Sequence, residues 1–238
     1  MVFKTTHWCW YKCPHCCENS GPHRPREFMP EDVIKYYINQ ANNDTRFNKS
    51  VVLTGGEIMA SYKFGPQNYV PNIMKYIMDS GTGLDIKTNG AWVRTPLKQV
   101  IINDFKDLAQ NYQKWLSLFQ ISLSVDSFHH NAIQNNHEII HELAKCKNAR
   151  IMVHVSGFND QTDIMDKFIN ELKQDKELKV EFLQMMSANS APIPVILIND
   201  GAVFLQTSTN AQLFSGGRAA NLPNAQQIKY PQFSFATR

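Results

Sequence analysis

Short apolar runs alternate along the chain with longer segments whose apolar residues recur at helical spacing. The run at 51–53 stops at a Gly-Gly pair, as a short buried strand does, whereas apolar residues in 68–80 recur every three or four positions, as in a helix. We expect strands at 2–6, 51–53, 84–88, 118–125, 150–155 and 178–184. We expect helices at 30–40, 68–80, 96–111, 131–146 and 161–174.

Six strands alternating with helices predict an α/β fold with parallel pairing and right-handed crossovers. Six units are fewer than the eight that close a full barrel, so we expect a partial (βα)6 barrel with ligands at the carboxyl ends of its strands. Beyond residue 186 the pattern weakens, and 193–205, broken by Asn199-Asp200-Gly201, predicts a β-hairpin with an Asp-Gly turn. We therefore expect a core at 1–185 and, at 186–238, a C-terminal β-hairpin and irregular extension of the same domain.

Composition narrows the class of protein only slightly. Of the 238 residues 43% are apolar, which suffices for one core, and the net charge of +3 without a dense basic stretch suggests no nucleic-acid partner. No apolar run approaches the roughly 20 residues of a membrane span, and the first residues do not resemble a signal peptide. We expect a cytoplasmic protein that has no membrane partner and whose cysteines serve as thiols or ligands rather than disulfides.

Four of the five cysteines lie between positions 9 and 17, which is typical of a metal site rather than a disulfide framework. In the spacing C-x3-C-x2-C, Cys9, Cys13 and Cys16 can hold three irons of a [4Fe–4S] cluster and leave the fourth iron open. A structural zinc site is the alternative, with its fourth ligand from Cys17 or from one of His7, His15 and His23. We interpret Cys17 as a spare thiol and Cys146 as a packing residue.

The order of further motifs resembles the radical S-adenosylmethionine (SAM) superfamily across roughly residues 2–185. After the cysteine loop come Gly55-Gly56-Glu57 at the end of the second strand and Thr88-Asn89-Gly90 at the end of the third. The fourth strand carries the run 122–129, Ser-Leu-Ser-Val-Asp-Ser-Phe-His. The resemblance implies a partial barrel of the radical SAM type. One departure is His15, because the residue before the third cysteine is usually aromatic in the family and approaches adenine through its backbone.

The resemblance also implies cofactors and roles. A [4Fe–4S] cluster would cleave SAM reductively to a 5′-deoxyadenosyl radical, and this radical would remove hydrogen from a substrate. The electron donor would be a protein such as flavodoxin or ferredoxin. The enzyme would then be an oxidoreductase or a transferase. Glu57 would orient the methionyl ammonium, and Gly55 and Gly56 would let the backbone approach the ligand. The candidates for ribose and carboxylate contacts are Asn89, Ser122, Ser124 and Asp126. We assign no residue to the substrate side.

The substrate is less defined. Residues 215–220, which contain Arg218, resemble the Gly-Arg-Ala segment of SPASM- and twitch-type members, many of which modify peptides, and Arg218 would lie near SAM. No cysteines follow Arg218, so an auxiliary-cluster domain is not expected. Three hypotheses stay open: a radical SAM enzyme acting on a peptide or protein side chain, one acting on a small metabolite such as a nucleoside or cofactor precursor, and a non-catalytic zinc- or cluster-binding module.

Overall fold

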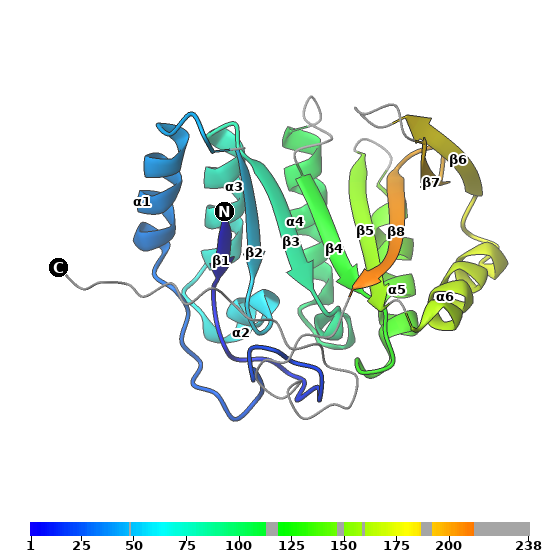
Figure 1. Ribbon diagram of the computed structural model, residues 1–238, viewed down its shortest axis with the longest axis horizontal. Helices are drawn as coiled ribbons and strands as arrows, with labels where there is room; N and C mark the ends of the chain where they lie inside the picture. The colour runs from blue at the N-terminus through cyan, green and yellow to red at the C-terminus, as the bar shows by residue number, and fades with distance from the viewer. Residues whose placement is uncertain (48, 113–118, 147–149, 159, 187–191, 212–238) are drawn as a thin grey trace.

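The computed structural model describes residues 1–47, 49–112, 119–146, 150–158, 160–186 and 192–211, arranged around one eight-stranded sheet (Figure 1). The strands are β1 (Val2–Lys4), β2 (Ser50–Thr54), β3 (Gly83–Thr88), β4 (Phe119–Ser124), β5 (Ile151–Phe158), β6 (Val180–Met186), β7 (Pro192–Ile198) and β8 (Val203–Ala211). The α-helices are α1 (Glu31–Asn42), α2 (Ser61–Phe64), α3 (Tyr69–Asp79), α4 (Lys98–Asn111), α5 (Ala132–Ala144) and α6 (Thr162–Gln174).

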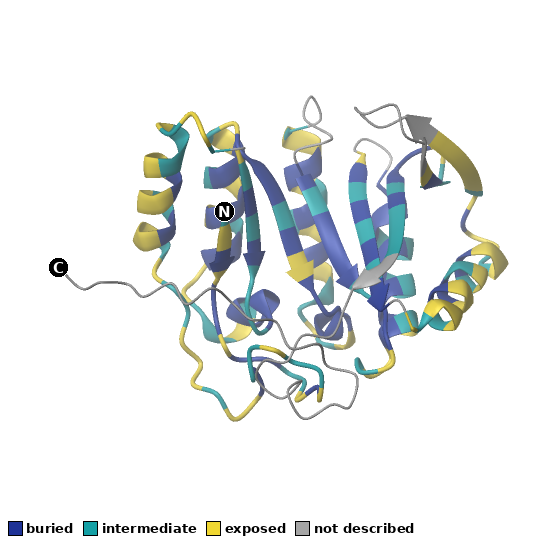
Figure 2. Ribbon diagram, viewed as in Figure 1, coloured by how far each residue is buried: buried dark blue, intermediate teal, exposed yellow. Residues whose placement is uncertain are grey.

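Strands β1 to β5 are parallel neighbours, and their side chains alternate between two different environments. On β4, Ile121 and Leu123 are fully buried against the helices that lie behind the sheet in Figure 1, whereas Ser122 and Ser124 lie on the opposite side. Figure 2 shows the same alternation of buried and less buried positions along the central strands. One face of the sheet therefore builds the core, and the other face carries polar groups.

The strand after α6 does not take the sixth parallel position, so that part of the predicted topology is wrong. The strand that pairs with β5 is β8, in parallel register from Ile151↔Val203, and β6 lies at the sheet edge, antiparallel to β7. Burial explains why β8 rather than β6 pairs with β5. Val203 and Leu205 of β8 are fully buried, whereas Phe182 and Leu183 of β6 are 53% and 45% exposed.

The predicted hairpin and its turn are confirmed. Strands β7 and β8 are antiparallel, and between them Asn199, Asp200 and Gly201 all have positive φ angles, of 51°, 56° and 90°. Asn, Asp and Gly are the residues that tolerate this conformation best. The hairpin is thus what brings β8 back beside β5.

The α/β class and the open, partial barrel are confirmed. In the described part of the chain β1 and β6 each pair with one neighbour, so the sheet does not close. Pairing of β6 with β7 and of β5 with β8 crosses residue 186, and the division into a core and an extension there stays a prediction. None of the described helices is both long and apolar enough to span a membrane.

Three short helical segments follow strand ends and were not expected from the sequence. They are 3-10 helices at Ile58–Ala60 and Ala91–Arg94, and the four-residue helix α2. The first follows β2 and the second follows β3, so both lie at the carboxyl edge of the sheet. There they fix the path of the chain directly after the Gly-Gly-Glu and Thr-Asn-Gly motifs.

Candidate functional site

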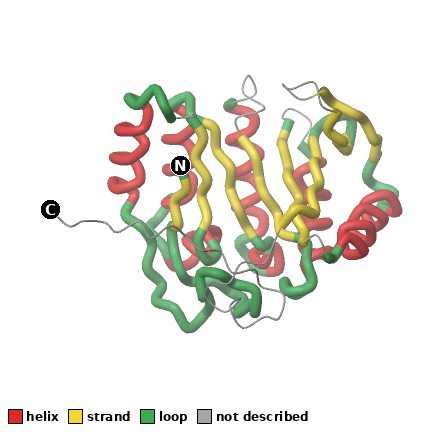
Figure 3. The backbone as a smooth tube through the Cα atoms, in the orientation of Figure 1, coloured by secondary structure: helices red, strands yellow, loops and turns green. Residues whose placement is uncertain are grey.

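The loop between β1 and α1 carries four cysteines and runs across the carboxyl ends of the strands (Figure 3). Main-chain hydrogen bonds attach its first residues to the end of β2: Thr5 N donates to Thr54 O at 2.8 Å, and Gly56 N donates to Thr6 O at 2.6 Å. Glu57 N continues the series by donating to Trp8 O at 2.8 Å. The loop therefore enters the site as a continuation of β1 along β2.

Gly55 and Gly56 are required by this close approach. A Cβ atom on Gly56 would lie 2.1 Å from Trp8 O, and one on Gly55 would lie 2.4 Å from Thr6 O. Gly55 also has a φ of +133°, which is a conformation that residues with side chains rarely adopt. Both glycines also line a cavity beneath the loop, so their main-chain atoms are accessible from that cavity.

A cavity of about 300 Å³ lies beneath the loop, and Cys9, Cys13, Cys16 and Cys17 all line it. Cys9 and Cys13 are buried, Cys16 is half-buried and Cys17 is exposed. Its other lining residues come mainly from the ends of β1 to β4, among them Lys4, Thr54, Lys87, Thr88, Asn89 and Ser124. The three cysteines of the C-x3-C-x2-C pattern thus converge on one cavity with residues of the other motifs.

Each of these three cysteines takes part in a hydrogen bond through its sulfur. Cys9 Sγ accepts from Tyr11 N at 3.4 Å and from Asn89 Nδ2 at 3.3 Å, and Cys16 Sγ accepts from Ser20 N at 3.3 Å. Cys13 is hydrogen-bonded to the His129 side chain. Donors of this kind stabilise negative charge on sulfur, which is how proteins support thiolates that bind iron.

Cys17 is arranged differently from the three. Its sulfur faces Glu18 Oε1 at 4.0 Å, and burial followed by the Glu18 charge raises the pKa of the thiol. A neighbouring carboxylate disfavours a thiolate, and Cys9 also lies near one, so exposure rather than this charge separates Cys17 from the three. The pKa of Cys9 is also raised, to about 12, by burial and then by Glu57.

Glu57 is fully buried and lies outside the cavity lining. Its carboxylate accepts from Thr88 Oγ1 at 2.9 and 3.0 Å, from Asn89 N at 2.9 Å and from Met59 N at 3.1 Å. Burial raises its pKa to about 7, although these hydrogen bonds act in the opposite direction. The carboxylate therefore joins the end of β2 to the end of β3 from behind the cavity.

Asn89 faces the cavity but is already engaged. Its Nδ2 donates to Cys9, and its Oδ1 accepts from Ala91 N at 2.9 Å. Asn89 thus lies against the cysteine loop, and its contact with SAM stays a prediction.

The three candidates for SAM contacts on and after β4 lie in different places. Ser124 lines the cavity, whereas Ser122 donates to Asp85 Oδ1 at 2.6 Å on the neighbouring strand β3 and does not line it. Asp126 follows the strand, is buried, and is absent from the lining. Ser124 is thus the one of the three that lines the cavity, and contact of Ser122 and Asp126 with SAM stays a prediction.

His15 lines the cavity as part of an aromatic group. Its ring stacks on Phe128 with a centroid distance of 4.7 Å and meets the edge of Phe158 at 5.5 Å. Of these rings only His15 lines the cavity, where its flat imidazole, held by the two phenylalanines, lies beside the cysteines and is suited to a purine. Arg218 lies outside the described residues.

Sequence reasoning missed the roles of Tyr11 and His129. Tyr11 OH donates to His130 O at 3.0 Å and accepts from Asn135 Nδ2 at 3.3 Å, so it ties the cysteine loop to the start of α5. Nothing in the spacing of an aromatic residue between two cysteines predicts this contact. His129 ends the run at 122–129, whose pattern predicts no role for it, although its side chain lines the cavity.

Two solved structures of Streptococcus suis SuiB are similar to this chain. The structure bound to S-adenosylmethionine has 12% sequence identity and a TM-score of 0.42, and the match covers 90% of this chain and 51% of that chain. A second SuiB structure has 11% identity and a TM-score of 0.41, and the match covers 95% of this chain and 52% of that chain. This chain therefore spans about half the length of those proteins. A search among curated proteins gave no match. The family model described as the radical SAM superfamily matches residues 3–198, and the chain belongs to that superfamily.

Proposed function

We propose that this protein is a radical SAM enzyme that holds a [4Fe–4S] cluster on Cys9, Cys13 and Cys16 and binds SAM in the adjoining cavity. The observation that carries the proposal is the convergence of these three thiols, each hydrogen-bonded through its sulfur, on one cavity with Gly55, Gly56 and the His15 ring. Three cysteine ligands leave one iron for a small molecule, and when bound the cluster supplies the electron for reductive cleavage of SAM.

The residues of the chain divide the remaining work. The His15 ring, held by Phe128 and Phe158, offers the surface for adenine, and the main chain at Gly55 and Gly56 admits the methionyl part of SAM. Ser124 is the β4 hydroxyl that lines this cavity. Glu57 supports the site by holding Thr88 and Asn89, and direct contact with the methionyl ammonium would require one of its present donors to move.

For the substrate we favour a peptide or protein side chain, with a small metabolite as the alternative. The support is the Gly-Arg-Ala pattern around Arg218 and the polar face of the sheet beside the cavity, where Asp85, Ser122 and His154 carry hydrogen-bonding groups. A polar face that spans several strands suits an extended substrate with many donors and acceptors. The electron donor and a cytoplasmic location stay predictions.

Metal analysis of cysteine variants tests the cluster assignment. After anaerobic reconstitution we expect about four irons per chain in the parent, in Cys17→Ala and in Cys146→Ala, and a large loss of iron in Cys9→Ala, Cys13→Ala and Cys16→Ala. Addition of SAM should change the electron paramagnetic resonance (EPR) spectrum of the reduced cluster. Purified protein that holds zinc, assembles no cluster and does not bind SAM would instead support a zinc-binding module.

A fractionated extract tests the substrate class. An extract of the source cells is divided by ultrafiltration, and each fraction is added to the reconstituted protein with SAM and a reductant. Stimulation of 5′-deoxyadenosine formation by the retained fraction, lost after protease treatment, would support a peptide or protein substrate. Stimulation by the filtrate alone, insensitive to protease, would contradict it in favour of a metabolite.

A further inference from the structure

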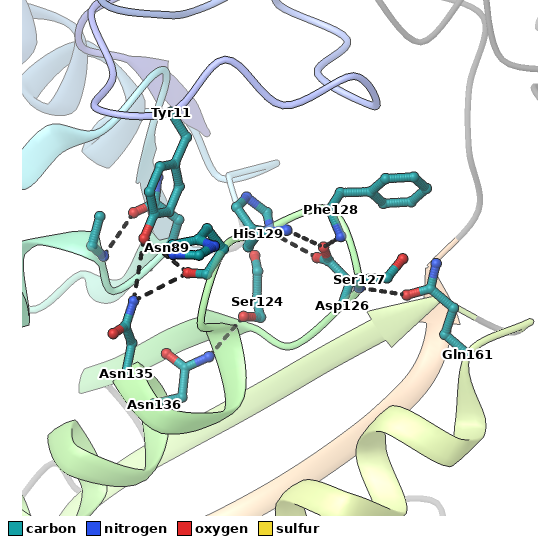
Figure 4. A network of polar contacts seen from close by, with 12 residues as sticks. Tyr11, Asn89, Ser124, Asp126, Ser127, Phe128, His129, Asn135, Asn136 and Gln161 are labelled. Carbon is teal, nitrogen blue, oxygen red and sulfur yellow. Dashed lines mark hydrogen bonds and ion pairs between the residues drawn. The ribbon is translucent and has the colours of Figure 1, made fainter.

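The turn between β4 and α5 holds a carboxylate and an imidazole in fixed positions. Asp126 Oδ1 accepts from the main-chain nitrogens of Phe128 at 2.9 Å and His129 at 3.0 Å, and Asp126 Oδ2 pairs with His129 Nδ1 at 2.8 Å (Figure 4). The Asp126 side chain is 4% exposed. Both of its oxygens are therefore used within the turn, and the carboxylate is poorly placed to contact a ligand.

His129 is the member of this pair that faces the cavity. Its ring is packed edge-on against His15 at a centroid distance of 4.8 Å and lies 6.1 Å from the Tyr11 ring. The Asp126 bond fixes one ring nitrogen, and the side chain makes its second hydrogen bond with Cys13. The ring thus joins a buried carboxylate to a cysteine that we assign to the cluster, and hydrogen bonds to a metal ligand of this kind orient the ligand.

The ligand atoms of His15, Asp126 and His129 lie within 4.8 Å of one another, a spacing that could also hold one metal ion. The Asp126–His129 contact at 2.8 Å is, however, a direct hydrogen bond, and the other Asp126 oxygen is bound by two main-chain amides. A metal would have to displace the first of these bonds. The group is therefore better described as a hydrogen-bonded pair beside a stacked ring.

The three cysteines differ in the charge of their partners. Cys9 accepts from a main-chain amide and the Asn89 carboxamide, and Cys16 accepts from a main-chain amide, so these donors are uncharged. Cys13 has an imidazole whose far side is bound to a carboxylate. Reduction adds one negative charge that is shared by the irons and sulfurs, so a polarised donor on sulfur stabilises the reduced cluster more than the oxidised one.

We propose that His129 is a positioning residue that donates to the Cys13 sulfur, is oriented by Asp126, and raises the reduction potential of the cluster. The proposal rests on the proposed function, because it requires the cluster on Cys9, Cys13 and Cys16. It assigns to the Asp-to-His part of the β4 motif a role toward the cluster rather than toward the ribose of SAM. The consequence is that a milder reductant suffices to deliver the electron.

The test is an EPR-monitored redox titration of reconstituted protein without SAM, with iron and sulfide measured in each sample. In His129→Ala the midpoint potential should become more negative, by ~59 mV if the ratio of reduced to oxidised cluster falls tenfold at a fixed ambient potential. His129→Gln keeps an N–H donor and should restore part of the shift, and Asp126→Asn should shift the potential in the same direction by less. His130→Ala, the exposed neighbouring histidine, is the matched control and should titrate like the parent.

The possible outcomes distinguish failure of the His129 proposal from failure of the proposed function. A parent protein that assembles no cluster would refute the proposed function and the inference with it. A full cluster in His129→Ala that titrates at the parent's potential would overturn the inference alone. If His129→Ala fails to hold a cluster, the two conservative variants decide: a more negative potential in Asp126→Asn supports the inference, and parental potentials in both Asp126→Asn and His129→Gln overturn it.

Discussion

Cys9, Cys13 and Cys16 share hydrogen-bonded sulfurs and a common cavity, whereas Cys146 accepts a hydrogen bond from Gln110 but lies outside that cavity. The spacing of the sequence identifies Cys9, Cys13 and Cys16, but it carries no sign of Asn89 or Ser20 as donors to them. Asn89 stands 80 positions from Cys9, and only the parallel pairing of β1, β2 and β3 brings the two together. Side-chain partners of this kind depend on rotamers and on neighbouring strands, so a pattern along one chain does not reveal them.

Replacement of Asn89 tests the donor to Cys9. Asn89→Asp keeps the shape of the side chain but removes the N–H and places an acceptor against the sulfur, so the cluster should lose iron to a chelator several-fold faster than in the parent. Iron release under anaerobic conditions, followed by absorbance, provides the measurement. Asn72→Asp, an exposed change of the same type on α3, should behave like the parent. Equal rates in all three proteins would remove Asn89 from the support of the cluster.

The burial of Glu57 predicts a pH dependence of stability in the cluster-free protein. Its pKa is raised from 4.5 to about 7, so between these values the folded chain holds a proton that the unfolded chain releases. The free energy of unfolding should therefore fall as pH rises from about 5 to 7, by an amount of order a few kcal/mol at most. Urea unfolding of the parent and of Glu57→Gln across this range isolates the contribution, because the variant lacks the titrating group. Parallel pH profiles for the two proteins would contradict the assignment.

At the scale of elements, periodicity predicts which segments become strands but not which strands become neighbours. Both 178–184 and 193–205 have strand patterns, and the order along the chain favoured the first as partner of β5. The structure gives that place to β8, because its apolar side chains fill the core while those of β6 are exposed. Pairing is decided by which segment buries more apolar surface, and that sum depends on the whole sheet.

Substitution of one leucine on β8 and one on β6 tests whether β8, rather than β6, packs beside β5. Leu205→Ala on β8 should lower the free energy of unfolding by about 2–5 kcal/mol, because it opens a cavity in the core. Leu183→Ala on the edge strand β6 should change it by no more than ~0.5 kcal/mol. Chemical denaturation of both variants beside the parent measures the difference. The reverse order of effects would show that 178–184 and not β8 lies against β5.

The crowded entry of the cysteine loop supports a further prediction. In Gly56→Ala the new Cβ would meet Trp8 O at 2.1 Å, so the loop must move away from β2 and cluster assembly should fall well below that of the parent. Gly81→Ala is the matched control, since Gly81 has a φ of +70° but no neighbouring atom within 4 Å. It should cost about 1 kcal/mol of stability and leave iron content unchanged. Full iron content in Gly56→Ala would show that the loop tolerates another path.

At the scale of the whole molecule, the carboxyl ends of parallel strands gather motifs that are far apart in the sequence. The cysteine loop, Gly-Gly-Glu, Thr-Asn-Gly and the end of β4 follow successive strands, so their meeting at one edge could be predicted before any coordinates. Whether each side chain points into the cavity or away from it could not be predicted in this way. Glu57 faces away from the cavity and Asp126 faces its own turn, because each carboxylate is satisfied by nearby main-chain amides.

Formation of 5′-deoxyadenosine shows whether this chain cleaves SAM at a cluster held by three cysteines. Anaerobically reconstituted protein is incubated with SAM and a strong reductant, and the product is quantified by mass spectrometry. We predict 5′-deoxyadenosine in the parent and in Cys17→Ala, and none above background in Cys13→Ala. A parent that holds a full cluster and binds SAM but gives no more product than Cys13→Ala, even with every extract fraction added, would contradict the account.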